Sequence, residues 1–183
     1  MTTAAAASAA TRVQVAHPSG ARIIELLKES GVGEVVALPD IVTSDGLLWP
    51  ISRDPEIRLT RVCKEDEGVS ICAAMSCNGT RAVLLMQQTG LMDSLNAVRA
   101  IGVDYQRPVV MLVGLLEKEP HLPASKSAAY GVRIVGPVLS AMGISHSTID
   151  EPEDVESIVR LIDDAYAKSC PHVFLIGRAP VAP

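Results

Sequence analysis

Short aliphatic segments alternate with amphipathic segments along this chain, and this alternation constrains the fold more than any other feature. Segments of strand length occur at residues 35–38, 57–63, 82–86, 108–113, 144–148 and 172–176. Segments with helical periodicity occur at residues 19–30, 44–51, 67–77, 91–103, 130–142 and 152–168. Aliphatic strands that alternate with helices are typical of an open sheet buried on both faces. We therefore predict an α/β fold with a doubly wound, mostly parallel six-stranded sheet and helices on both faces.

The composition fits one such domain. Hydrophobic residues make up 48% of the 183 residues and aromatic residues only 3%, so the core must be built from aliphatic side chains. This length suits a single domain with a full core. Residues 1–16 are rich in Ala, Thr and Ser and lack a basic start, so we expect a disordered tail and not a signal peptide. Residues 17–183 are expected to form the single domain.

Charge and cysteine usage exclude several classes of protein. The net charge of −5 and the absence of a basic stretch argue against nucleic acid as a partner. No apolar run approaches the roughly 20 residues that cross a bilayer. The four cysteines have no metal-ligand spacing, so we expect buried free thiols and a cytoplasmic location.

Polar loops should gather at one edge of the predicted sheet. In doubly wound sheets, ligands bind outside the carboxyl ends of the strands. The loops at that edge are residues 39–41, 63–68, 87–93 and 114–127. Three of these four loops carry unusual side-chain chemistry, which makes this edge the candidate site.

The acidic segment Lys64-Glu65-Asp66-Glu67 lies between a predicted strand and a predicted helix. Acidic residues at a helix N-terminus are stabilised by the helix dipole, by roughly 0.3–1 kcal/mol each when exposed. That structural explanation does not account for the apolar run at residues 69–75, which places the carboxylates beside a core helix.

The segment Gln87-Gln88-Thr89-Gly90 follows a buried strand directly. Ordinary turn and capping chemistry could explain it, with Gly90 allowing close approach of the backbone. A polar loop that lies against a flat ring could explain it equally well. The segment contains neither a G-x-G-x-x-G motif nor a Walker loop, so a dinucleotide site is poorly supported.

Residues 64–73 and 85–97 together resemble the pyrimidine-binding domain of thiamine-diphosphate enzymes. The likeness is greatest to the α subunit of sulfopyruvate decarboxylase and to the related domain of phosphonopyruvate decarboxylase. It extends from the first predicted helix to the last predicted strand. The resemblance implies a thiamine-diphosphate-dependent 2-oxo acid decarboxylase.

The resemblance also implies a catalytic role for one glutamate. In these enzymes a Glu after the second strand hydrogen-bonds the ring nitrogen of the cofactor's aminopyrimidine. The pair Ala73-Ala74 in the following helix places this role on Glu65, and a register slip of two residues would place it on Glu67. A carboxyl group kept protonated by an apolar site can share a proton with the ring at neutral pH.

Further residues are implied at the cofactor or the substrate. The set expected near the cofactor ring, besides Glu65, is Pro39, Asp40, Gln87, Thr89 and Gly90. Gln88 and His121 are expected near the substrate, although an ordinary exposed loop histidine would explain His121 as well.

The other half of such an enzyme holds diphosphate and Mg²⁺ through a Gly-Asp-Gly motif, which this sequence lacks. No acidic cluster with Mg²⁺-ligand spacing replaces it, so no metal ligand is expected on this chain. By resemblance, a β subunit brings the motif, the active site forms between chains in a hetero-oligomer, and this chain is inactive alone.

One departure leaves the substrate open. The related decarboxylases tend to carry an Arg-Gly pair after the fourth strand, whereas this chain has Leu115-Leu116-Glu117-Lys118. Without a guanidinium, recognition of a sulfonate or phosphonate is weakened. Lys118 or Lys126 could compensate, or the substrate could be a less anionic 2-oxo acid. Carboligation of the acetolactate-synthase type, a non-catalytic interaction subunit and a nucleotide-binding module remain alternatives.

Overall fold

The computed structural model describes residues 15–182, so the tail expected at residues 1–16 lies almost wholly outside the described residues. The strands are β1 (Val32–Ala37), β2 (Arg58–Arg61), β3 (Arg81–Gln87), β4 (Val110–Gly114), β5 (Ser145–Ile149) and β6 (His172–Ile176). The α-helices are α1 (Gly20–Glu29), α2 (Trp49–Ile51), α3 (Glu65–Cys77), α4 (Gln88–Asp93), α5 (Leu95–Ala97), α6 (Tyr130–Ala141) and α7 (Ile158–Lys168). Short π and 3₁₀ segments complete the chain: η1 (Ser44–Leu48), η2 (Val98–Asp104), η3 (Ala124–Lys126) and η4 (Pro152–Ser157).

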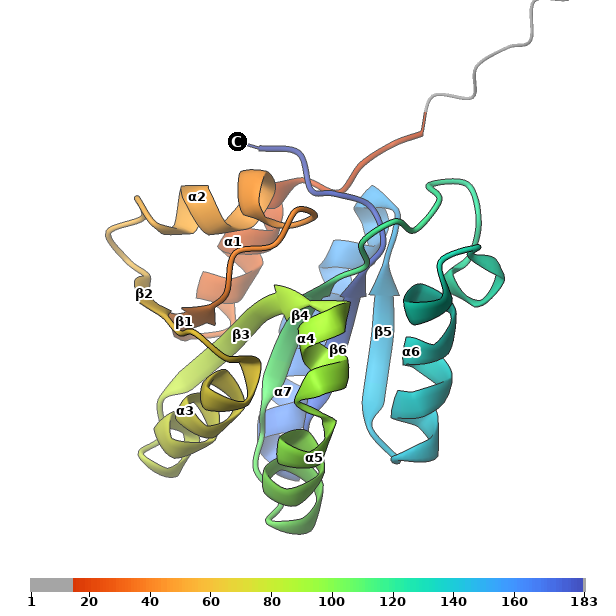
Figure 1. Ribbon diagram of the computed structural model, residues 1–183. Coiled ribbons are helices and arrows are strands. Elements are labelled where there is room, and N and C mark those ends of the chain that lie inside the picture. Colours follow the sequence, from red (N-terminus) through yellow and green to blue (C-terminus); the bar gives the residue numbers. More distant parts are fainter. Residues whose placement is uncertain (1–14, 183) are drawn as a thin grey trace, which may run out of the picture.

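All six strands form one parallel sheet in the order β2-β1-β3-β4-β6-β5, as Figure 1 shows. The prediction of a doubly wound six-stranded α/β sheet is confirmed. The central strands β3, β4 and β6 are buried almost along their whole length. Burial on both faces explains why they are aliphatic throughout and do not alternate with polar residues.

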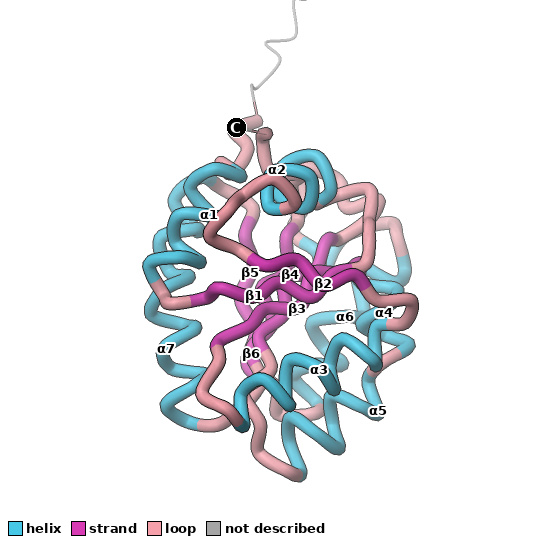
Figure 2. Tube along the Cα trace, turned by 90° about the vertical axis from the view of Figure 1, so that its left-hand side faces the viewer, coloured by secondary structure: helices cyan, strands magenta, loops and turns pink. Residues whose placement is uncertain are grey.

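Helices cover both faces of the sheet. Alternate side chains along each strand point to opposite faces, so Val35 of β1 joins one core cluster and Val36 joins the other. The first cluster packs against α1, η1, α2 and α7, and the second packs against α3, α4, η2 and α6. Figure 2, which views the sheet nearly edge-on, shows α1 and α7 on one side and α3, α5 and α6 on the other.

Two helices begin earlier than the sequence pattern predicts. α3 begins at Glu65 and not at residue 67, because the carboxylate of Glu67 accepts hydrogen bonds from the backbone N–H groups of Cys63 and Lys64 and caps the helix. α4 begins at Gln88, so Gln88 to Gly90 form a helical turn and not a loop. The helix expected at residues 91–103 is also interrupted at Ser94.

The four cysteines are free, as expected, but the expectation that they are buried is correct only for Cys72. Cys77 is exposed because it lies in the last turn of α3, and Cys63 is exposed in the connection that follows β2. Cys170 is intermediate. Among residues 15–182, the helices are all too short or too polar to cross a membrane.

His172, the first residue of β6, is a buried polar group in the sheet. Its two ring nitrogens lie 3.0 Å from the hydroxyl of Ser145 and 3.1 Å from the hydroxyl of Ser147, both on the neighbouring strand β5. Burial, aided by the nearby His146 and Arg160, lowers the pKa of His172 from 6.5 to about 4. The folded protein therefore holds this imidazole neutral at a pH where the unfolded chain protonates it.

This lowered pKa predicts a loss of stability in mild acid. Protons bind the unfolded state first, so the free energy of unfolding should fall as the pH drops from about 6.5 towards 4. For His172 alone the fall between pH 7 and pH 5 should be about 2 kcal/mol. Urea unfolding at both pH values should show a smaller fall in His172→Asn than in the wild type. Equal falls in the two proteins would contradict the prediction.

Candidate functional site at the carboxyl edge of the sheet

The carboxyl ends of β1 and β3 define the candidate site. These strands are neighbours in the sheet, but β1 leads to η1 and α2 on one face and β3 leads to α4 on the other. The connections that follow these two neighbouring strands therefore run to opposite faces of the sheet. Open α/β sheets bind ligands at such a point. The α3 N-terminus and the segment after β4 lie at the same edge of the parallel sheet.

Glu65 and Gly90 are in direct contact. A Cβ atom placed on Gly90 would lie 2.0 Å from Oε1 of Glu65 and 2.2 Å from its Cδ. Gly90 is buried and Glu65 is half-buried, so the carboxyl group occupies the space that any side chain at position 90 would fill. The structure thus brings together two residues, 25 positions apart in the sequence, that the sequence analysis placed at the cofactor.

Glu65 is the least engaged acid of the Glu65-Asp66-Glu67 segment. Glu67 is exposed and caps α3, and Asp66 accepts a hydrogen bond of 2.9 Å from the backbone N–H of Glu67 and lies 3.6 Å from Nζ of Lys64. Within residues 15–182, neither a hydrogen bond nor an ion pair engages the Glu65 carboxylate. Its oxygens are therefore available to a group from outside this chain.

Asp40 organises the loop after β1. Its carboxylate accepts hydrogen bonds from the backbone N–H of Val42 (2.7 Å), from the backbone N–H of Thr43 (2.9 Å) and from the Thr43 hydroxyl. Burial raises the pKa of Asp40, although the hydrogen bonds from Thr43 and Val42 oppose this effect. The loop lies over the end of β4, where a Cβ on Gly114 would be 2.8 Å from Oδ1 of Asp40. Pro39, directly before it, is exposed.

The first turn of α4 carries the remaining residues expected near the ring. Nε2 of Gln87 donates a 2.7 Å hydrogen bond to the hydroxyl of Thr89, which is exposed. The side chain of Gln88 points elsewhere: its Oε1 accepts from the backbone N–H of Leu116 (2.8 Å) and its Nε2 donates to the carbonyl of Leu116 (3.3 Å). This turn thus contacts α3 through Gly90 and the segment after β4 through Gln88.

His121 and Lys118 do not join this cluster. His121 is exposed on the loop that follows Pro120, and within the described residues its ring forms no hydrogen bond. The side chain of Lys118 is fully buried, with Nζ 3.1 Å from Oδ1 of Asp150. The sequence analysis placed residues 114–127 at this edge but did not predict that Gly114 contacts the Asp40 loop or that Leu116 pairs with Gln88.

The side chains at this edge offer one carboxylate with free oxygens and no group of metal-ligand type. Among residues 15–182, His, Cys, Asp and Glu side chains nowhere gather in a group of three or more that could bind a metal ion. An unengaged carboxylate against a glycine offers a ring nitrogen a partner without a side chain in the way. The fold is a doubly wound α/β sheet, and Glu65 and the first turn of α4 form the candidate site at its carboxyl edge.

Comparison with known proteins agrees with this architecture. Sulfopyruvate decarboxylase from Methanosarcina acetivorans is 28% identical over 167 residues, which cover 85% of this chain and 39% of that protein. The α subunit of sulfopyruvate decarboxylase from Methanothermobacter thermautotrophicus is 28% identical over 138 residues, or 75% of this chain and 82% of the subunit. The corresponding subunit from Methanocaldococcus jannaschii is 28% identical over 91 residues, or 50% of this chain and 53% of the subunit.

The chain is a distant homologue of sulfopyruvate decarboxylase α subunits over most of its length. It spans 39% of the Methanosarcina protein and about half of two of the α subunits that it matches. The sequence matches no protein-family model.

The contact between Glu65 and Gly90 can be tested by substitution. Gly90→Ala should destabilise the protein by about 1–3 kcal/mol, because the new methyl group displaces a half-buried carboxyl group. Truncation in Glu65→Ala should relieve most of this loss, so a double-mutant cycle measured by urea unfolding should show strong coupling. Additive effects in the cycle would contradict the contact.

Gly131→Ala is a matched control. Gly131 is also in a helix, α6, but a Cβ there meets no atom within 4 Å. Because Ala has the higher helix propensity, this variant should be neutral or stabilised by up to about 1 kcal/mol.

Proposed function

We propose that this chain is the subunit of a thiamine-diphosphate-dependent 2-oxo acid decarboxylase that binds the cofactor's aminopyrimidine ring. Homology to sulfopyruvate decarboxylase α subunits supports the class of reaction. The observation that carries the residue assignment is the half-buried Glu65 carboxylate, which packs on Gly90 and has no partner among the described residues.

Glu65 is assigned the proton-sharing role. A carboxyl group placed against a ring nitrogen can hydrogen-bond it and share a proton with it. Glu67 is less suited, because it is exposed and its carboxylate caps α3. When bound, thiamine diphosphate supplies the nucleophilic carbon that adds to the oxo carbon and accepts the electrons as carbon dioxide leaves.

Gly90 and the first turn of α4 orient the ring. Gly90 leaves room for the Glu65 carboxyl group and keeps the backbone close to it. The hydrogen bond from Gln87 to Thr89 fixes two polar side chains at the same turn. Asp40 holds the neighbouring loop at the end of β4, so its role in this proposal is to shape this edge of the sheet.

A partner subunit is part of the proposal. The sequence contains no Gly-Asp-Gly motif, and Lys118, the cation directly after β4, is buried in an ion pair. A second polypeptide would hold diphosphate and Mg²⁺ and close over Glu65. Three of the similar proteins are named as α subunits, which supports an enzyme of two kinds of subunit.

The test is reconstitution of the enzyme from this chain and a second protein. We expect that protein to carry the Gly-Asp-Gly motif and to be encoded beside this chain. Alone, the chain should release no carbon dioxide from 2-oxo acids. With that protein, thiamine diphosphate and Mg²⁺, it should release carbon dioxide and an aldehyde, and Glu65→Gln should lower kcat by at least about 100-fold, since proton-sharing groups contribute that much. A 2-hydroxy ketone product would indicate carboligation instead.

Glu67→Gln is the matched control, since it removes one neighbouring carboxylate on the same helical turn. It should keep most of the activity. It should lose some stability, because the Glu67 carboxylate caps the start of α3. Full activity in Glu65→Gln, or loss of activity only in Glu67→Gln, would overturn the assignment of Glu65.

A further inference from the structure

The segment that follows β6 crosses the carboxyl edge of the sheet and pairs with the residues before α1. We call residues 178–181 the strap. Val181 of the strap donates its backbone N–H to the carbonyl of Pro18 (2.8 Å), and its own carbonyl accepts from the N–H of Gly20 (2.9 Å). Figure 1 shows this part of the chain beside α2 and beside the segment that leads into α1. The strap therefore fixes that segment at the carboxyl edge.

The strap, η1 and the start of α1 pack against one another through glycines. A Cβ on Gly46 of η1 would lie 2.2 Å from the carbonyl oxygen of Pro180 in the strap. A Cβ on Gly20 would lie 2.1 Å from the carbonyl oxygen of Gly46. All three residues are buried, and the atoms that fill both gaps belong to the backbone. Since backbone atoms have no rotamers with which to yield, η1 is wedged between α1 and the strap.

η1 in turn holds the loop after β1. The carbonyl of Thr43 accepts hydrogen bonds from the backbone N–H groups of Leu47 (2.8 Å) and Leu48 (3.3 Å), both in η1. Thr43 also donates its backbone N–H and its hydroxyl to the carboxylate of Asp40. The same loop lies against Gly114 at the end of β4. Direct contacts thus lead from the strap through η1 to the loop that borders the ends of β1 and β4.

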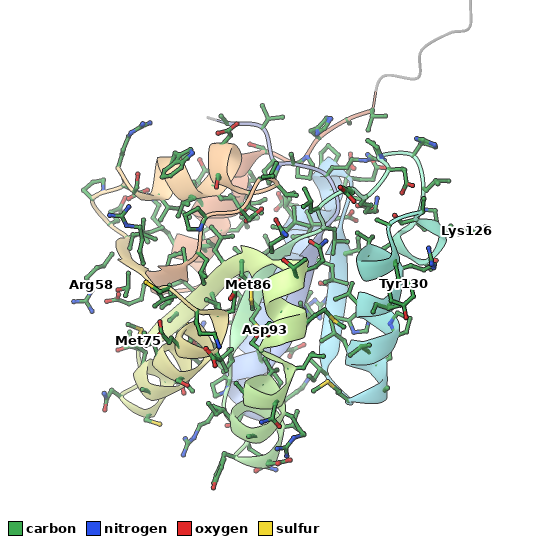
Figure 3. All side chains as sticks on the ribbon, in the orientation of Figure 1. Arg58, Met75, Met86, Asp93, Lys126 and Tyr130 are labelled. Atoms are coloured by element: carbon green, nitrogen blue, oxygen red, sulfur yellow. The ribbon has the colours of Figure 1, made fainter. Side chains whose placement is uncertain are left out.

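The strap also reaches the connection after β4, through Arg178. Its Nε and Nη2 donate to the carbonyl of Pro120 at 3.0 Å and 2.8 Å, and its Nη1 donates to the carbonyl of Ala16 at 2.9 Å. Nη1 also lies 2.6 Å from the carboxylate of Glu151, and only 10% of the arginine side chain is exposed. In Figure 3, where Met86 marks the end of β3, the strap and these connections lie above it.

We propose that the strap positions the loop after β1, with Gly46 and Val181 as the positioning residues, and thereby sets how tightly the site holds thiamine diphosphate. The second half of this inference rests on the proposed function, and the first half does not. The loop borders the site because β1 is the neighbour of β3, whose chain turns directly into α4. A loop already held in place loses little freedom when a ligand binds, whereas a loose loop must be ordered at a cost in affinity.

Substitution of Val181 tests the first half in the full chain without its partner. Val181→Pro removes the N–H group that pairs with Pro18, and the ring of proline suits an extended segment. Hydrogen exchange at the amides of Gly20, Val42 and Thr43 should become about three- to tenfold faster, as expected for the loss of one hydrogen bond. The amides of β4 should keep their protection, because the strap does not pair with that strand.

Val181→Ala is the matched control. It keeps the N–H group and shortens a side chain that is 56% exposed, so exchange at all these amides should stay as in the wild type.

Gly46→Ala disturbs the same contact from the side of η1. The new methyl group meets the backbone of Pro180, so exchange at Val42 and Thr43 should again become faster. Gly33→Ala is its control, because a Cβ on this β1 residue meets no atom within 4 Å.

In the reconstituted enzyme, the second half predicts an effect on cofactor affinity and not on turnover. With the partner protein in excess, Val181→Pro should raise the KM for thiamine diphosphate by about three- to tenfold, in proportion to the loosening of the loop. At saturating cofactor its kcat should stay close to the wild-type value. Val181→Ala should change neither constant. General destabilisation would instead lower kcat by reducing the amount of active enzyme.

Four outcomes separate the parts of this inference. Unchanged exchange at Val42 and Thr43 in both Val181→Pro and Gly46→Ala would refute the positioning role. Faster exchange that extends equally to β4 would refute it as well. Faster exchange at the loop with an unchanged KM for thiamine diphosphate would refute the link to the cofactor. Release of carbon dioxide from no 2-oxo acid by the wild type would refute the proposed function and leave the exchange result standing.

Discussion

The close contact between Gly90 and the Glu65 carboxyl group is the constraint on which the binding edge depends. A side chain at position 90 would occupy the volume of the carboxyl group, so the start of α4 can lie this near the start of α3 only with glycine there. A similar contact joins α3 to β3 of the sheet, since a Cβ on Gly68 of α3 would lie 2.4 Å from Cδ1 of Leu84. Together these contacts set the distance between α3, α4 and β3, and they hold the Glu65 carboxyl group at the edge without a hydrogen bond from residues 15–182.

Backbone geometry, more than a network of polar side chains, defines the rest of the edge. Asp40 uses its carboxylate to fold its own loop, and Gln88 uses its amide to hold a neighbouring peptide segment. These two buried polar side chains thus serve the shape of the edge, whereas the Glu65 carboxylate has no hydrogen-bond partner among residues 15–182. Under the proposed function, a site of this kind would hold a flat ring mainly by shape and by one hydrogen bond.

The sequence predicted the fold well because its signal is spread over many residues. Aliphatic strands in regular alternation with helices specify a parallel sheet, and the burial of Val83 and Leu112 follows from that pattern. Helix starts were predicted less well, because Lys64 is not a typical capping residue and the carboxylate of Glu67 supplies the cap. The partnership of Gln88 with Leu116 could not be predicted, since the two residues are 28 positions apart and meet only after the strands have paired. The exposure of Cys63 likewise depends on where β2 ends.

The hydrogen bonds from Gln88 reach the peptide groups of Leu116 and leave its side chain untouched. Position 116 can therefore change its amino acid during evolution while its main chain stays in place. A single codon change there would alter the chemistry that the edge offers without rebuilding the scaffold. Related proteins can in this way diverge by replacing the residue at position 116 alone, because the Gln88 amide holds the backbone there in place.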